Sequence, residues 1–239
     1  TGDSAARTTR FGVFLLVLGG WVVTLCLHEF GHAYAAHRAG DTSVEAAGYL
    51  TLNPLKYAHP VLSLLLPLLF IAQGGIGLPG GAVYLHPHTF RTRAARSRAA
   101  AAGPLANVVF GAAILLIVRA YGPGFTVNGF LLPGPDSHLA FWSGLAFLGF
   151  LQVSAAVLNL LPIPGLDGYA IIEPYLDPDT ARPLERVKPF GMIAVFILLQ
   201  QRQINTWFFD IVDWLYERTG ASTALYSFGY GLFRFWRNY

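Results

Sequence analysis

Charge is scarce in this sequence. Of its 239 residues only 12% are Asp, Glu, Lys or Arg, about half the share of roughly 25% that soluble domains carry. There is a single cysteine, Cys26, which excludes an intramolecular disulfide framework. Hydrophobic residues make up 54% of the chain, with 18 Phe, 11 Tyr and 5 Trp among them. This composition excludes a disordered chain, argues against a free-standing soluble globule and is typical of a membrane protein.

Three apolar runs are long enough to cross a bilayer, which takes about 20 residues in a helix. They comprise residues 11–36, 99–121 and 139–161. Residues 60–79 are also apolar but are interrupted by proline and glycines, which predicts a broken or re-entrant segment. Residues 80–85 form either an edge strand or a plain loop, and residues 189–199 are too few to cross alone.

The C-terminal part has a different pattern. From residue 204 onward apolar residues recur at helical spacing with polar residues opposite, which predicts an amphipathic helix at the membrane interface or against the bundle. The predicted apolar face comprises Ile204, Trp207, Phe208, Ile211, Trp214 and Leu215. We therefore expect an all-α polytopic membrane protein with three core transmembrane helices. It forms one domain, 1–239, with a core over about 11–175 and C-terminal membrane or interfacial helices over about 187–239. Whether residues 60–79 and 189–215 cross the membrane is left open.

The basic residues contain one cluster, directly before the second apolar run, formed by Arg91, Arg93, Arg96 and Arg98. A basic cluster beside an apolar run is typical of a cytoplasmic loop, because positively charged loops stay on the cytoplasmic side. The other basic residues are scattered. We therefore expect no nucleic-acid partner, despite the net charge of +3.

Ionisable residues occur inside the first apolar run, where they are rare and usually functional. In a helix His28 and His32 lie one turn apart on one face, so both imidazoles can bind one metal ion. Glu29 lies beside them and can take a proton from water activated by the metal. The alternative is a pair of packed histidines with a hydrogen-bonded Glu, which the apolar setting disfavours.

Catalytic zinc usually has three protein ligands, so this pair needs a third. A third histidine six residues after His32 is absent, because that position is Arg38. Asp167 follows the third apolar run, where two prolines end the helix and flanking glycines allow a tight turn that can aim its carboxylate inward. Glu173 and Glu185 are possible in principle, but their charged stretch is typical of a solvated segment.

These features resemble the site-2 protease family of intramembrane zinc metalloproteases, in its short prokaryotic form without a PDZ domain. The resemblance lies in the His-Glu-Phe-Gly-His run that begins at His28, the Ala-Gly-Pro-Leu-Ala-Asn run that ends at Asn107, and the stretch from Asn159 to Gly168. Residues 51–56, which read Thr-Leu-Asn-Pro-Leu-Lys, also resemble a segment of the shorter prokaryotic members. Residues 57–60 depart from it, since they read Tyr-Ala-His-Pro where the family has His-x-Asp-Pro.

The resemblance implies a function and the residues that carry it. The implied activity is zinc-dependent hydrolysis of peptide bonds in or near transmembrane segments of membrane proteins, as in regulated intramembrane proteolysis. The implied partners are the transmembrane segment of a protein substrate and the lipid bilayer, while the oligomeric state is open. The alternative is a non-catalytic membrane protein that binds metal or transmembrane partners. The implied roles are zinc ligation by His28, His32 and Asp167, general-base catalysis by Glu29, and binding of substrate or oxyanion by Asn107 and Asn159.

A shared metal site also constrains the topology. His28 and His32 lie in the C-terminal half of the first run, and Asp167 lies just past the end of the third, so these two helices must run in the same direction. With the arginine cluster in the cytoplasm, the third helix runs inward. We therefore expect a multi-pass protein of a prokaryotic plasma membrane, with its zinc site toward the cytoplasmic side and with residues 60–79 not crossing as a single span.

Overall fold

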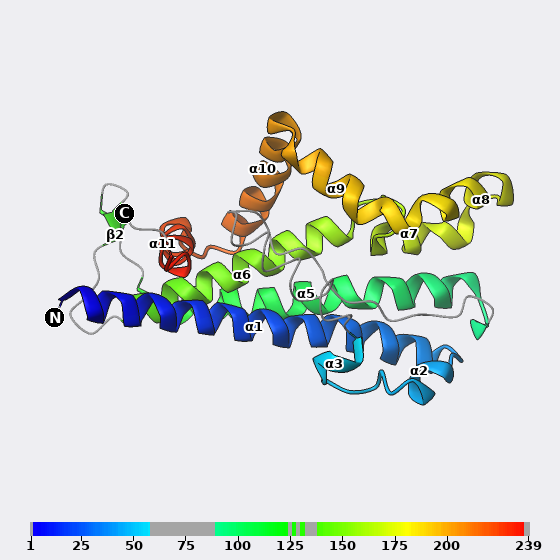
Figure 1. The fold of residues 1–239 in the computed structure, drawn as a ribbon, viewed down its shortest axis with the longest axis horizontal. Coiled ribbons are helices and arrows are strands. Elements are labelled where there is room, and N and C mark those ends of the chain that lie inside the picture. Colours follow the sequence, from blue (N-terminus) through cyan, green and yellow to red (C-terminus); the bar gives the residue numbers. More distant parts are fainter. Residues whose placement is uncertain (1, 58–88, 124–125, 128–129, 132–137, 237–239) are drawn as a thin grey trace.

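The computed structural model describes residues 2–57, 89–123, 126–127, 130–131 and 138–236 (Figure 1). The predictions for residues 60–79 and 80–85, and for His59, lie outside these ranges. Within them the chain is almost entirely helical, which confirms the all-α prediction. The exception is a short antiparallel pair, β1 (Thr126–Val127) with β2 (Phe130–Leu131).

Three long helices form the bundle: α1 (Gly2–Arg38), α5 (Arg93–Tyr121) and α6 (Leu139–Asn159). Each contains a stretch long and apolar enough to cross a membrane, which confirms the three runs found in the sequence. In Figure 1, α1 and α6 run in the same direction and α5 runs the opposite way. This is the arrangement that a metal site shared by the first and third helices requires.

Helix α5 begins earlier than its apolar run. The side chain of Thr92 caps the helix, because its Oγ1 accepts a hydrogen bond from the backbone N–H of Ala95 at 3.0 Å. Arg93, Arg96 and Arg98 therefore lie in the first turns of α5, whereas the basic cluster was predicted to lie in a loop. The basic cluster remains at the same end of the span.

Helix α6 is the centre of the bundle. Of its apolar stretch 72% is buried, against 39% for α1 and for α5. Small residues allow this close packing: a Cβ at Gly111 would lie 2.8 Å from Cβ of Gln152, and a Cβ at Gly149 would lie 2.4 Å from Cδ2 of Leu115. Helices α1 and α5 consequently present one apolar side outward, with exposed residues that include Leu15, Val23, Leu105, Val109 and Leu116.

Shorter elements surround the bundle. After α1 come α2 (Ser43–Ala46) and α3 (Pro54–Tyr57). After α6 come α7 (Asp167–Ile172), the 3-10 turn η3 (Glu173–Tyr175), α8 (Pro178–Val187) and the 3-10 turn η4 (Lys188–Phe190). The chain continues with α9 (Gly191–Gln200), α10 (Arg202–Arg218) and α11 (Thr223–Phe233). Figure 1 shows α9 and α10 as a V that projects from the bundle, with α7 and α8 at the end where α5 begins.

The predicted amphipathic helix near the C-terminus is present as α10, but its buried side differs from the predicted one. Phe208, Val212 and Tyr216 are buried, while Trp207 and Trp214, assigned to the same apolar face, are more than half exposed. The reason is tertiary: the helix packs on α6, and the rings of Phe209 and Tyr216 both contact Phe150. Helix α10 therefore has one apolar side against the bundle and another facing outward.

Candidate metal centre

Three ligand-type side chains meet between α1 and α7. Nε2 of His28 lies 3.2 Å from Oδ2 of Asp167, and Nε2 of His32 lies 3.3 Å from Oδ1. The two histidine nitrogens are 3.0 Å apart, and the three ligand atoms all lie within 4.8 Å of one another. Both histidines are buried in the bundle. The structure thus brings together the three residues that the sequence suggested as metal ligands.

A hydrogen bond at Nδ1 orients each of the two imidazole rings. Nδ1 of His32 lies 2.8 Å from the backbone oxygen of Ala99, and Nδ1 of His28 lies 2.5 Å from Oδ1 of Asn107. Carbonyl and amide oxygens only accept hydrogen bonds, so both histidines must donate from Nδ1. In the neutral imidazoles Nε2 then carries a lone pair, and both lone pairs point toward the Asp167 carboxylate.

A chain of polar side chains inside the bundle fixes the orientation of Asn107. The hydroxyl of Thr24 donates to the backbone oxygen of Trp21 at 2.9 Å, and it accepts from Nε2 of Gln152 at 3.0 Å. Oε1 of Gln152 in turn accepts from Nδ2 of Asn107 at 2.9 Å. Because each donor in this chain is already assigned, the oxygen of Asn107 must face His28. All three helices of the bundle contribute to this support.

The donor set fits a zinc ion. Two nitrogen lone pairs and a carboxylate repel one another at these distances unless a proton or a metal cation lies between them. Two histidines and one carboxylate are a ligand set used by catalytic zinc. Helix α5 leaves the necessary space through Gly103, where a Cβ would lie 2.2 Å from Nε2 of His32 and 2.7 Å from Nε2 of His28.

A tight turn after α6 places Asp167. Gly165 has a φ of +100°, and a Cβ at Gly168 would lie 2.2 Å from the backbone oxygen of Leu160. Both positions therefore favour glycine. The turn directs the Asp167 carboxylate toward the Nε2 atoms of His28 and His32.

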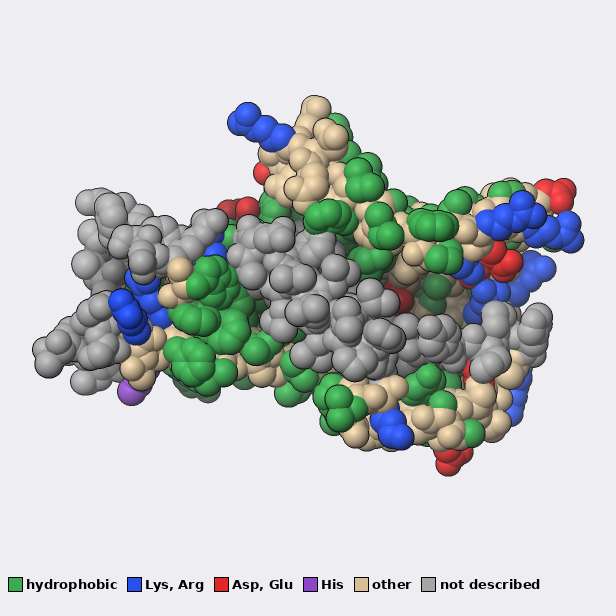
Figure 2. Space-filling view, viewed as in Figure 1, with side chains coloured by type: hydrophobic (Ala, Val, Ile, Leu, Met, Phe, Trp, Pro, Cys, Tyr) green, Lys and Arg blue, Asp and Glu red, His purple; other side chains and the backbone are tan. Residues whose placement is uncertain are grey.

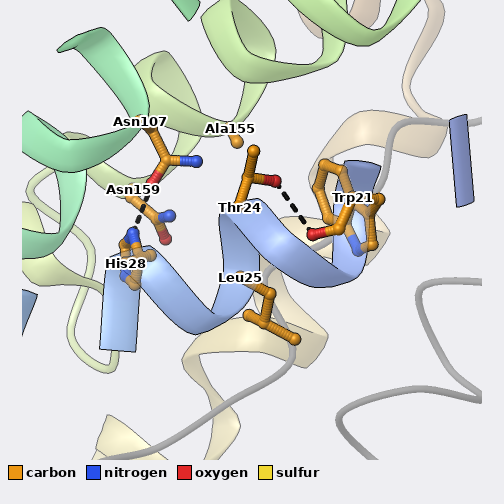
Figure 3. Close-up of a pocket in the computed structure, with 7 residues that line it drawn as sticks. All are labelled: Trp21, Thr24, Leu25, His28, Asn107, Ala155 and Asn159. Carbon is orange, nitrogen blue, oxygen red and sulfur yellow. Dashed lines mark hydrogen bonds between the residues drawn. The ribbon is translucent and has the colours of Figure 1, made fainter. Parts of the chain in front are cut away.

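The two other residues predicted to act in the site are also close to it. Glu29 follows His28 in α1 and is 3% exposed. Asn159, the last residue of α6, lies beside His28 in the wall of a cavity of about 10 Å³ (Figure 3), a volume near the minimum for one water molecule. The cavity is lined by Trp21, Thr24, Leu25, His28, Asn107, Ala155 and Asn159.

Sequence reasoning was wrong about Glu173 and silent about several neighbours of the site. Glu173 is buried and paired with Arg96 and Lys188, whereas its charged stretch suggested a solvated side chain. Glu185, the other alternative ligand, is exposed. The supporting role of Gln152 was missed, although a polar residue inside an apolar run is a signal that could have identified it. The space left by Gly103 had no such signal.

Comparison with known proteins gives close relatives. The chain is 53% identical over 234 residues to "Putative zinc metalloprotease Rip2" of Mycolicibacterium smegmatis, covering 98% of this chain and 85% of the relative. The protein of the same name from Mycobacterium tuberculosis is 48% identical over 235 residues, covering 98% and 86%. "Putative zinc metalloprotease YwhC" of Bacillus subtilis is 30% identical over 181 residues, covering 74% and 76%. No protein-family model matches the chain, and no solved structure matches it.

Proposed function

Since the chain belongs to the site-2 protease family of zinc metalloproteases, we propose that it hydrolyses peptide bonds in or near transmembrane segments of membrane-protein substrates. The observation that carries this proposal is the convergence of two buried histidines and one carboxylate, whose ligand atoms lie within 4.8 Å of one another. The histidines lie on α1, a helix apolar enough to cross a membrane, and the carboxylate lies on α7. A metal centre at this place is suited to substrates that reach it within the bilayer.

The proposed ligands of zinc are Nε2 of His28, Nε2 of His32 and the carboxylate of Asp167. When bound, zinc supplies a Lewis acid that polarises the scissile carbonyl and makes water more acidic. The chain's own residues do the rest. The hydrogen bonds at Nδ1 hold both imidazoles with their lone pairs toward the ion, so little reorganisation is needed on binding.

Glu29 is the proposed general base. It takes a proton from the attacking water as the water oxygen bonds to the carbonyl carbon, and it passes that proton to the amide nitrogen as the C–N bond breaks. Its buried position beside His28 keeps this transfer away from bulk solvent. We assign the substrate contact to Asn159, because the orientation of Asn107 is fixed by the bond from one N–H of its amide to Gln152 and by the bond that its oxygen accepts from His28.

A helical substrate must unwind at the site, because its carbonyl groups are bonded internally in the helix. A donor such as the amide of Asn159 replaces part of the hydrogen bonding that unwinding removes. The arginine-rich start of α5 is the proposed cytoplasmic end of the span, in a prokaryotic plasma membrane. Because the chain turns from α6 into the ligand Asp167 toward that same end, the site is proposed to lie in the cytoplasmic half of the bilayer.

The test measures zinc content and cleavage on the same purified samples. We expect one zinc per chain in the wild type, no zinc in His28→Ala and Asp167→Ala, and retained zinc in Glu29→Gln. Cleavage of single-span test proteins in phospholipid vesicles should fall by about 10²- to 10⁴-fold in Glu29→Gln, the range typical of general-base catalysis. Undiminished cleavage in Glu29→Gln would overturn the mechanism, and zinc without any cleavage in the wild type would favour a non-catalytic protein.

A further inference from the structure

Glu173 is a buried carboxylate that the proposed mechanism does not use. Its side chain is 4% exposed, and both of its oxygens are paired. Nη2 of Arg96 donates to Oε2 at 2.5 Å, and Nζ of Lys188 donates to Oε1. A carboxylate is expensive to bury unless charged donors satisfy it, so the fold retains this group together with two cations. Arg96 and Lys188 are themselves about one quarter and one third exposed.

The pairing joins three parts of the fold. Glu173 opens η3, directly after α7, which begins with Asp167. Arg96 lies in the first turns of α5, and Lys188 opens η4, immediately before α9. A neighbouring bond strengthens the first connection, since Oγ of Ser97 donates to the backbone oxygen of Ile171 at 2.5 Å. Two consecutive residues of α5 therefore hold both ends of the α7–η3 junction.

The same stretch of α5 also orients a metal ligand. One turn after Arg96, the backbone oxygen of Ala99 accepts the hydrogen bond from Nδ1 of His32. His32 and the segment that carries Asp167 are thus both attached to residues 96–99, although α1 and α7 are far apart in the sequence. A shift of α7 relative to α5 would change the distance between the Asp167 carboxylate and the His32 nitrogen.

Lys188 also contacts the segment that carries Asp167. A Cβ at Gly165 would lie 2.5 Å from the backbone oxygen of Lys188, so the turn before Asp167 packs directly on this residue. Its side chain meanwhile reaches Glu173, beyond the far end of α7. Lys188 therefore contacts the Asp167 segment both before and after the ligand.

We infer that Glu173 is a positioning residue of the metal centre, which fixes Asp167 at ligand distance by tying the α7–η3 segment to Arg96 on α5 and to Lys188 at the base of α9. The inference rests on the proposed function, because it takes Asp167 as the third zinc ligand. Glu173 does not touch the ion or the substrate and acts only through Asp167. Loss of its charge frees both cations and loosens the ligand.

The test is zinc affinity, measured by competition with a chromogenic chelator on the purified protein in detergent. Loss of outer partners of metal ligands typically weakens binding about 10- to 100-fold, and we expect roughly a 10-fold loss for Glu173→Gln. Glu185→Gln is the matched control, since it removes an exposed carboxylate from the neighbouring α8. The visible spectrum of the cobalt-substituted protein should change in Glu173→Gln and not in Glu185→Gln, because that spectrum reports ligand geometry.

A second pair of variants covers the case in which Glu173→Gln does not fold. Arg96→Lys keeps a cation near Glu173 and should retain most of the zinc affinity, whereas Arg96→Leu should weaken zinc binding about as much as Glu173→Gln, roughly 10-fold. Wild-type affinity and an unchanged cobalt spectrum in Glu173→Gln or in Arg96→Leu would overturn the inference while leaving the proposed function intact. Absence of zinc from the wild type would instead refute the proposed function itself.

Discussion

Gly103 shows how much a single residue can decide in this protein. Its Cα faces the two Nε2 atoms from α5, and any larger side chain would enter the space between them. The distance of 2.2 Å from a Cβ to Nε2 of His32 is close to a zinc–nitrogen bond of about 2.0–2.1 Å. A methyl group at position 103 would therefore compete with the ion for the same volume.

We predict that Gly103→Ala abolishes zinc binding. The expected result is a fall from one zinc per chain to nearly none, measured by mass spectrometry of the purified protein. Gly19→Ala is the control, because nothing lies within 4 Å of a Cβ at that position of α1. Full zinc content in Gly103→Ala would show that the ion binds elsewhere.

Asn107 is a second single residue on which the metal site depends, because it orients His28. Its oxygen holds Nδ1 of His28, and its amide nitrogen is held by Gln152. Replacement by Leu keeps a similar volume but leaves His28 without an acceptor, so we expect zinc affinity to weaken about 10- to 100-fold. Gln152 is one hydrogen bond further from the metal ligands than Asn107, so Gln152→Leu should weaken zinc binding less in the same chelator competition. Equal zinc affinity in Asn107→Leu and wild type would contradict the proposed orienting role.

At the scale of elements, the bundle depends on close contacts between helix backbones. Helix α11 lies on α6, where a Cβ at Gly229 would be only 2.0 Å from the backbone oxygen of Ser143. Aromatic residues complete this contact, with the rings of Phe147 and Phe233 centred 5.5 Å apart. The same Phe233 ring also meets the first half of α1, where the Phe14 and Phe233 rings are centred 5.3 Å apart. Helix α11 therefore supports the bundle away from the metal ligands.

We predict that Gly229→Ala lowers the stability of the bundle by about 1–3 kcal/mol, the usual cost of an overpacked contact, and leaves zinc content unchanged. The measurement is thermal unfolding in detergent, with zinc determined on the same sample. Gly231→Ala, in the same helix but facing open space, should be neutral or slightly stabilising because alanine favours a helix. A loss of zinc in Gly229→Ala would show that α11 reaches the site.

At the scale of the whole molecule, charge and apolar surface are separated. Figure 2 shows the largest group of Lys and Arg side chains at the end that carries α8, a smaller group at the opposite end, and hydrophobic side chains over the bundle. The end with α8 also carries the start of α5, so the basic residues of two distant segments lie together. Such a distribution matches a cytoplasmic face under the positive-inside rule, and it supports the proposed orientation of the zinc site.

The two ends of α5 provide a test of this orientation. In a Cys26→Ala background, we predict that a membrane-impermeant maleimide added to intact cells labels Tyr121→Cys and does not label Arg93→Cys. Both positions are exposed at opposite ends of the helix, so each is accessible once its side of the membrane is reached. Permeabilised cells, in which both variants should react, serve as the control. The reverse labelling pattern would place the zinc site toward the outside.

The spans and the histidine pair could be predicted from the sequence, because both depend on local regularities. Apolar length decides which segments can cross a bilayer, and the spacing of His28 and His32 places them on one helix face. The sequence also indicated Asp167 as the third metal ligand, because the prolines and glycines around this residue predicted a turn. The direction of α1 relative to α6 followed only because one site had to be shared.

The tertiary structure alone decided what supports the site. Asn107 meets His28 across 79 positions of sequence, and Arg96 meets Glu173 across 77. No local pattern encodes such pairs, so Glu173 was taken as solvated and the bond between Asn107 and His28 was not predicted. The space at Gly103 and the burial of Phe208 rather than Trp207 on α10 likewise depend on which helix packs opposite. Local periodicity sets which residues share a face, whereas only packing determines what that face meets.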